Sequence, residues 1–248
     1  MNQVEKLKEY WEPKKEYIEK DLWVIRNFLT EEELDWVTKE ANDPSNWYTT
    51  MRSPYGGNIK NKFLGYIAQY DENGVVLPPH PDLNPQITEE AQKFLGTINA
   101  KCEAVLPKYF PGIGALQSFF EVPDDQIIKE LGHDVDYAMN FHYERDDEDD
   151  DEQQRIISQK KDGSKVLSKI KITAAFNIYI NNDFDGGILE FKNKDYKIYP
   201  EPGMLVNVPL YREFEHKVSK VTNGNRHTLY GRSWDNLEDR YYSSKDDC

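Results

Sequence analysis

The stretch ITAAFNIYINNDFDGGILEF, residues 172–191, carries the strongest signal for the fold. Its first half belongs to a run over 170–180 that is rich in β-branched and aromatic residues, which predicts a strand. The polar segment NNDFD and the pair Gly186–Gly187 then predict a turn, followed by a second strand, GILEFK, over 187–192. Short strands separated by turns of this kind are typical of a β-sandwich or a β-barrel.

The same alternation of strands and turns continues on both sides of this stretch. A short apolar run, DLWVIRNF over 21–28, predicts a strand near the N-terminus. After Gly112 four further strands are expected, at 115–122, 136–144, 203–209 and 226–234.

Two helices are predicted before most of the strands begin. Thr30 followed by Glu33 is a capping-box signature, and it opens a helix through about Ala41. From Ile87 onward apolar residues recur at spacings of three and four until Pro107 ends the helix. Because helices come first and strands follow, we expect the helices to cover one sheet rather than alternate with strands.

The domain organisation follows from where the composition changes. Residues 43–58 and the acidic-then-basic segment 146–165 are rich in turn-forming or charged residues, so both are expected to be loops. We expect an N-terminal helical extension over 1–20, one domain over 21–236 with a flexible acidic loop at about 145–165, and a C-terminal tail over 237–248.

Much of the net charge of −14 is concentrated in one place. Residues 144–152 hold eight acids and one arginine, so seven of the fourteen net negative charges lie there. No basic footprint for nucleic acid or for an anionic membrane is present. We therefore expect neither as a partner, and we expect the charge mainly to favour solubility.

The two cysteines, Cys102 and Cys248, are too few for a disulfide-rich secreted scaffold, and no Cys-x-x-Cys motif occurs. Cys102 falls on the apolar face of a predicted helix, so we expect a buried free thiol there. The N-terminal residues lack the apolar segment of a signal peptide, and no apolar run approaches the length of a membrane span. We expect a soluble, cytoplasmic protein.

One predicted strand ends in a candidate metal-binding pair, His142 and Glu144. Side chains at positions i and i+2 of a strand point to the same face, with Cα atoms roughly 6.5–7 Å apart, so both can reach one ion. Asp146 lies roughly another 6.5 Å along the strand and would need a bulge to take part. His133 is a rival first ligand, but its i+2 neighbour is Val135, which cannot coordinate a metal.

A second histidine, His216, begins the segment HKVSKVTNGNR, which ends at Arg226. Two histidines and one carboxylate form a facial set that leaves three coordination positions open on Fe(II). Such positions are needed where a chelating co-substrate and O₂ must both bind. A buried arginine near the metal can hold the distal carboxylate of that co-substrate through two parallel hydrogen bonds.

These motifs together resemble the Fe(II)/2-oxoglutarate-dependent dioxygenases, in particular the prolyl-4-hydroxylase-like branch. WVIRNFLTEEELDWV at 23–37 is similar to the opening strand and helix of that family. The other matching pieces are HYE at 142–144, the strand, turn and strand over 172–191, PEPGMLVNVP at 200–209 and the His-to-Arg segment 216–226. The resemblance spans roughly residues 21–236. It implies a mainly β fold, a double-stranded β-helix (jelly roll) with N-terminal α-helices packed on one sheet.

The resemblance also implies a role for each candidate residue. His142, Glu144 and His216 would hold Fe(II), although Glu144 stands where the branch most often has Asp. Arg226 would pair with the C5 carboxylate of 2-oxoglutarate, and Tyr179 matches a tyrosine that some members place near the same carboxylate. The implied reaction uses O₂, decarboxylates 2-oxoglutarate to succinate and hydroxylates a C–H bond, with a peptide or protein as the expected substrate. Ascorbate is a further cofactor that the family suggests.

Neighbouring residues are assigned other roles. Gly186 and Gly187 are expected to form the turn between strands, and His227 is expected to point to the face opposite Arg226.

Two alternatives to the oxygenase remain open. One is a cupin-like metal enzyme that keeps the histidines but needs no Arg226. The other is a metal-free jelly-roll binding module with the acidic loop as its contact surface.

Overall fold

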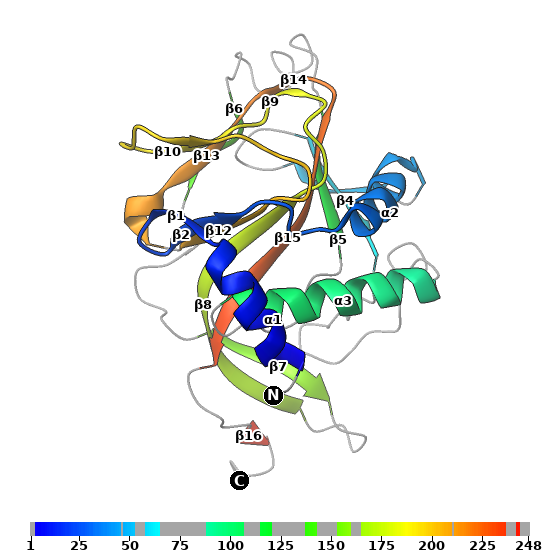
Figure 1. The fold of residues 1–248 in the computed structure, drawn as a ribbon, viewed down its shortest axis with the longest axis vertical. Coiled ribbons are helices and arrows are strands. Elements are labelled where there is room, and N and C mark those ends of the chain that lie inside the picture. The colour runs from blue at the N-terminus through cyan, green and yellow to red at the C-terminus, as the bar shows by residue number, and fades with distance from the viewer. Residues whose placement is uncertain are drawn as a thin grey trace.

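The computed structural model of the protein describes residues 3–45, 47–52, 58–64, 88–106, 115–120, 137–142, 153–159, 165–209, 211–236 and 242–243. In these ranges the chain forms a layer of helices, a ten-stranded antiparallel sheet and a four-stranded antiparallel sheet (Figure 1). The prediction of a mainly β protein with a few supporting helices is confirmed.

The large sheet has the strand order β1-β2-β12-β8-β15-β5-β4-β3, and β7 and β16 also pair with β8. Its strands are β1 (Glu16–Glu19), β2 (Leu22–Ile25), β3 (Trp47–Arg52), β4 (Asn58–Phe63), β5 (Ala115–Phe120), β7 (Gln153–Gln159), β8 (Lys165–Tyr179), β12 (Leu205–Pro209), β15 (Asn225–Asn236) and β16 (Tyr242–Ser243).

The small sheet has the order β11-β10-β13-β6. It consists of β6 (Tyr137–His142), β10 (Leu189–Phe191), β11 (Lys197–Ile198) and β13 (His216–Ser219), and the 3-10 helix η2 (Arg212–Phe214) leads into β13. A separate pair joins β9 (Asp185–Gly186) to β14 (Val221–Asn223). The strands predicted after Gly112, and the one predicted at 21–28, are therefore present as β5, β6, β8, β10, β12, β15 and β2.

Strand β8 is the centre of the large sheet. On one edge it pairs with β15 over its last two thirds, from Ile170 opposite Asn236 to Tyr179 opposite Thr228. On the other edge it pairs with β12 over residues 174–178 and with β7 over 165–170. A strand paired along both edges leaves few backbone N–H and C=O groups without a partner, so β8 provides a rigid support for both faces.

The helices pack on one face of the large sheet. They are α1 (Gln3–Trp11), the 3-10 helix η1 (Glu12–Lys14), α2 (Glu31–Asn42) and α3 (Glu89–Val105). The predicted capping box of α2 is confirmed, because Thr30 and Glu33 make both of its hydrogen bonds. The second predicted helix is present as α3, which begins at Glu89 after the N-cap Thr88, whose hydroxyl accepts from the Ala91 amide; Ile87, where the prediction began it, lies outside the described residues. The core between helices and sheet contains Trp11, Val37, Phe94, Ile98, Phe176, Ile178, Leu205 and Leu229.

The other face of the large sheet packs on the small sheet. The core there contains Leu22, Val24, Tyr179, Leu189, Phe191, Ile198, Val206, Val208, Phe214 and Val218. Strand β2 contributes to both cores, since Leu22 and Val24 face the small sheet while Trp23 and Ile25 face the helices. Burial on both faces explains why LWVI is apolar at every position instead of alternating.

Two predicted loops contain strands. Residues 47–52 within 43–58 form β3, and residues 153–159 within the predicted loop 146–165 form β7. Strand β3 contains aromatic and β-branched residues and β7 contains two isoleucines, but both lie beside Pro, Gly or charged neighbours, which favoured the prediction of a loop. The extension over 1–20 contains strand β1 as well as a helix, and the tail over 237–248 contains the short strand β16.

Two further expectations concern membrane-spanning segments and Cys102. Among the described residues, no helix combines the length and apolar character that crossing a membrane requires. Cys102 is a fully buried free cysteine in α3, as predicted, and burial raises the pKa of its thiol far above the ordinary value. A thiol held in its neutral form by burial is a packing residue rather than a nucleophile.

The packing of α3 on the sheet predicts a specific stability loss. Ile98 is 0% exposed in the helix-side core, so Ile98→Ala should lower the free energy of unfolding by about 2–5 kcal/mol. Glu103, exposed on the same helix, provides a matched control, and Glu103→Ala should change it by no more than about 0.5 kcal/mol. Urea unfolding of both variants measures the difference. Equal stabilities would show that α3 does not pack on the sheet as described.

Candidate functional site

His216 is the first residue of β13, in the middle of the small sheet. Its Cα partner on one side is Phe191 of β10, and on the other side it is His142, the last residue of β6. Residues directly opposite each other in an antiparallel ladder lie on the same face, with Cβ atoms about 4.5–5.5 Å apart. The register therefore brings together two strand positions, 74 residues apart in sequence, that the sequence singled out as metal ligands.

A hydrogen bond within its own turn orients the His216 ring. The side chain is 5% exposed and its ring lies 5.9 Å from the Phe191 ring. Its Nδ1 is 2.9 Å from the Phe214 carbonyl oxygen. A carbonyl oxygen can only accept, so Nδ1 carries a hydrogen, and in the neutral ring Nε2 is then the nitrogen with the lone pair. This is the arrangement in which a metal-binding histidine is usually found.

Arg226 lies near the start of β15, on the face of the large sheet that meets the small one. Its guanidinium carbon is 4.9 Å from the centre of the Tyr179 ring, and its side chain is 1% exposed. The hydroxyl oxygen of Tyr179 is also buried and has no hydrogen-bond partner among the described residues. A buried cation beside a buried hydroxyl that can still donate a hydrogen bond forms a site suited to an anion.

Gly187 packs directly against the stem of Arg226, a role beyond the predicted turn. Gly186 and Gly187 both have positive φ, +77° and +63°, and lie between β8 and β10, where Gly186 ends the short strand β9 and Gly187 follows it. A Cβ placed on Gly187 would lie 2.9 Å from the Arg226 Cδ and 2.5 Å from the Phe184 ring. Glycine here is required both by the backbone conformation and by the space that Arg226 occupies.

His227 points away from this site, as the alternation of a strand predicts. Its ring lies 5.6 Å from that of Trp47, which packs against the helix-side core. Burial lowers its pKa to about 4, an effect that the carboxylate of Asp183 opposes only in part. His227 is therefore a neutral packing residue at physiological pH.

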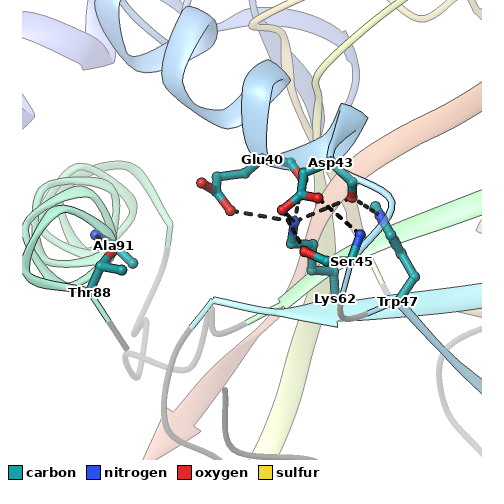
Figure 2. Close-up of polar contacts among 7 residues, drawn as sticks. All are labelled: Glu40, Asp43, Ser45, Trp47, Lys62, Thr88 and Ala91. Atoms are coloured by element: carbon teal, nitrogen blue, oxygen red, sulfur yellow. Dashed lines mark hydrogen bonds and ion pairs between the residues drawn. The ribbon is translucent and has the colours of Figure 1, made fainter. Parts of the chain in front are cut away.

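Trp47 is itself held by a polar network at the end of α2 (Figure 2). Its indole N–H donates to the Asp43 carbonyl at 3.0 Å. The buried ammonium of Lys62 donates to the Glu40 carbonyl at 2.7 Å and to the Asp43 carboxylate at 3.2 Å. Hydrogen bonds from Ser45, and then from Lys62, hold the pKa of Asp43 at about 2. A cation at the carbonyl end of a helix satisfies otherwise unpaired groups, so Lys62 fixes α2 to β4.

A residue that the sequence reasoning missed lies beside Arg226. Asn181, just after β8, donates from Nδ2 to the Asn225 carbonyl at 2.7 Å and accepts at Oδ1 from the His227 amide at 2.8 Å. Asparagine at a strand end often bonds neighbouring backbone in this way, which is the only local signal for it. The particular partners depend on the register of β8 and β15.

Part of the predicted ligand set lies outside the residues that the structure describes. Glu144, Asp146 and His133 lie outside the described residues, and for His142 only the backbone position is described. Among the residues the structure does describe, no group of three or more His, Cys, Asp or Glu side chains is close enough to hold a metal. The choice of Glu144 as the carboxylate ligand stays a prediction.

No protein-family model matches the sequence, and no curated protein matches it significantly. Among solved structures, a Pseudomonas putida prolyl-4-hydroxylase has a TM-score of 0.50 with 12% identity, covering 93% of this chain and 97% of that chain. A prolyl hydroxylase from Trichoplax adhaerens, in complex with a hypoxia inducible factor peptide fragment, has a TM-score of 0.46 with 15% identity, covering 95% of this chain and 91% of that chain.

A viral collagen prolyl hydroxylase from Paramecium Bursaria Chlorella virus-1, solved as a 2OG complex, has a TM-score of 0.42 with 18% identity, covering 86% of this chain and 96% of that chain. At such low identities a likeness of structure concerns the fold. The match to the Pseudomonas putida protein shows that this chain has a fold of the prolyl-4-hydroxylase kind.

The contact between Gly187 and Arg226 predicts that Gly187→Ala destabilises the protein by about 2 kcal/mol or more, since the new methyl group overlaps the arginine stem at a positive φ. Gly96 is the matched control, because a Cβ there meets nothing within 4 Å inside α3. Gly96→Ala should stabilise the protein by up to about 1 kcal/mol. Thermal or urea unfolding compares them, and an undiminished stability of Gly187→Ala would contradict the packing described.

The lowered pKa of His227 predicts a loss of stability in acid. Between about pH 6.5 and 4 the unfolded chain binds a proton at this histidine and the folded chain does not, so stability falls as the pH falls. The slope from this one group is at most about 1.4 kcal/mol per pH unit. His227→Gln should remove it. Urea unfolding from pH 7.5 to 4 measures both proteins, and parallel curves would exclude a buried neutral His227.

Proposed function

We propose that this chain is an Fe(II)/2-oxoglutarate-dependent oxygenase that hydroxylates a substrate C–H bond. The observation that carries the proposal is the placement of His216. It is buried, its Nδ1 hydrogen bonds to the Phe214 carbonyl, and it lies directly opposite position 142 on the neighbouring strand. The fold shared with a prolyl-4-hydroxylase supports the same conclusion, and we propose that the two packed sheets form a double-stranded β-helix.

The described residue of the proposed metal site, His216, is suited to Fe(II). His216 would bind through Nε2, while its Nδ1 hydrogen bond to the Phe214 carbonyl keeps the ring oriented and raises its basicity. His142 would supply the second nitrogen and Glu144 the carboxylate. Two imidazoles and one carboxylate are the donor set that Fe(II) oxygenases use, because it leaves positions open for other ligands.

The residues also fit 2-oxoglutarate. Arg226 would pair with the C5 carboxylate, and the Tyr179 hydroxyl would donate a second hydrogen bond to it. Both side chains are almost fully buried, so the attraction between guanidinium and carboxylate would be screened far less than in water. The ring of Tyr179 against the guanidinium and Gly187 against the arginine stem limit the directions in which Arg226 can extend.

When bound, Fe(II) would couple decarboxylation of 2-oxoglutarate by O₂ to hydroxylation, giving succinate, CO₂ and the hydroxylated product. The chain's own residues would bind and orient the co-substrate and keep bulk water from it.

We propose a peptide or protein as the substrate, from the resemblance of the sequence to prolyl 4-hydroxylases, and ascorbate as an accessory reductant. A cupin-like enzyme without 2-oxoglutarate would need no Arg226.

Anaerobic titration tests the proposal directly. Addition of Fe(II) and then 2-oxoglutarate to the protein should give a visible metal-to-ligand charge-transfer band. His216→Ala should abolish iron binding. Arg226→Lys keeps a buried cation but loses the planar fork, so it should retain iron and weaken 2-oxoglutarate by about 10- to 100-fold. His227→Gln, on the opposite face, is the matched histidine control and should keep both affinities.

The same titration identifies the carboxylate. Glu144→Ala should lose iron while Asp146→Ala retains it, and the reverse result would assign the ligand to Asp146. If the wild-type protein binds no iron and shows no band, the oxygenase proposal is wrong.

A further inference from the structure

Asn181 holds the backbone on both sides of Arg226. The ladder between β8 and β15 ends at the pair Tyr179 and Thr228, and a last backbone bond joins the Ile180 amide to the His227 carbonyl at 3.0 Å. Beyond this bond, the hydrogen bonds to β15 come from the side chain of Asn181. Its Nδ2 donates to the Asn225 carbonyl and its Oδ1 accepts from the His227 amide.

These two partners belong to the two peptide groups that flank the Arg226 Cα. The Asn225 carbonyl lies in the peptide group before it, and the His227 amide lies in the one after it. One carboxamide therefore bonds both peptide planes whose rotation would change the direction of the arginine side chain. The carboxamide cannot turn over, because Nδ2 also donates to the Asp183 carboxylate at 2.6 Å and both of its partners can only accept.

We infer that Asn181 is a positioning residue for the carboxylate-binding arginine. The inference rests on the proposed function, since it assigns Arg226 to the co-substrate. A long side chain amplifies small changes at its base, so a backbone rotation of about 10° moves the guanidinium by about 1 Å. A displacement of that size is enough to weaken a bidentate pair severely. Asn181 fixes the base of Arg226, and Gly187 and Tyr179 restrict its stem and its guanidinium.

The test measures binding of 2-oxoglutarate by calorimetry to the Fe(II)-loaded protein under anaerobic conditions. Asn181→Ala should raise the dissociation constant of 2-oxoglutarate about tenfold or more, with iron affinity changed less than about twofold. Asn181→Asp keeps the size of the side chain but turns an oxygen toward two acceptors, so it should weaken binding at least as much. Asn182→Ala removes the exposed neighbouring asparagine and should leave the dissociation constant unchanged.

A double-mutant cycle separates positioning from a general structural role. If Asn181 acts through Arg226, then Asn181→Ala should cost little further affinity in the Arg226→Lys background. In turnover assays the single variant should raise the KM for 2-oxoglutarate much more than it lowers kcat at saturation.

Three outcomes would overturn the inference. They are an unchanged dissociation constant in Asn181→Ala, fully additive losses in the double variant, and a wild-type-like Asn181→Asp. If the wild-type protein fails to bind 2-oxoglutarate at all, the proposed function fails and the role of Asn181 fails with it. If the wild type binds and Asn181→Ala binds equally well, only the positioning role is wrong.

Discussion

The antiparallel ladder between β8 and β15 is the constraint on which the rest of the structure depends. It runs from Ile170 opposite Asn236 to Tyr179 opposite Thr228, and both cores are built on its two faces. The packing across it is tight, because a Cβ on Gly231 would lie 2.2 Å from the ring of its cross-strand partner Phe176. A one-residue slip would place Phe176 against a residue with a side chain and would exchange the residues of the two faces, so the ladder has one allowed register.

That register also places the candidate site and the residues that pack behind it on opposite faces of the large sheet. Along β15, Arg226 faces the small sheet and the Tyr179 ring, while His227 faces Trp47 and the helices. Adjacent residues thus differ in charge, since Arg226 is a buried cation and His227 is kept neutral by burial. The helix layer provides the second of these environments, since Lys62 fixes α2 to β4 and Asp43 fixes the indole of Trp47 (Figure 2).

The parts of the fold that could be predicted from the sequence are those that depend on local signals. The capping box of α2 and the apolar spacing of α3 are each contained within one turn or one helix, so the sequence predicted both helices. Strand β7 was missed because its pairing with β8 is not visible in its own composition. In the candidate site, sequence motifs were enough to name positions 142, 179, 216 and 226 as candidates. His216 lies opposite position 142, and Asn181 bonds the backbone of β15, only because of how the strands pair. That pairing joins segments far apart in the sequence, so no local motif indicates it.

The candidate site has two halves, Arg226 with Tyr179 and His216 with His142, and the fold holds the first more firmly than the second. Arg226 and Tyr179 lie on strands paired along both edges, whereas β6, which carries His142, is the edge strand of the small sheet among the described residues. It pairs only with β13, and the ladder is irregular just after His216. Edge strands open more readily than central ones, since fewer hydrogen bonds must break. A metal shared by His216 and His142 would cross-link β13 to β6, so part of its binding free energy would stabilise that pairing. By this argument the large sheet would preorganise the proposed co-substrate site, while binding of the metal would itself complete the proposed metal site.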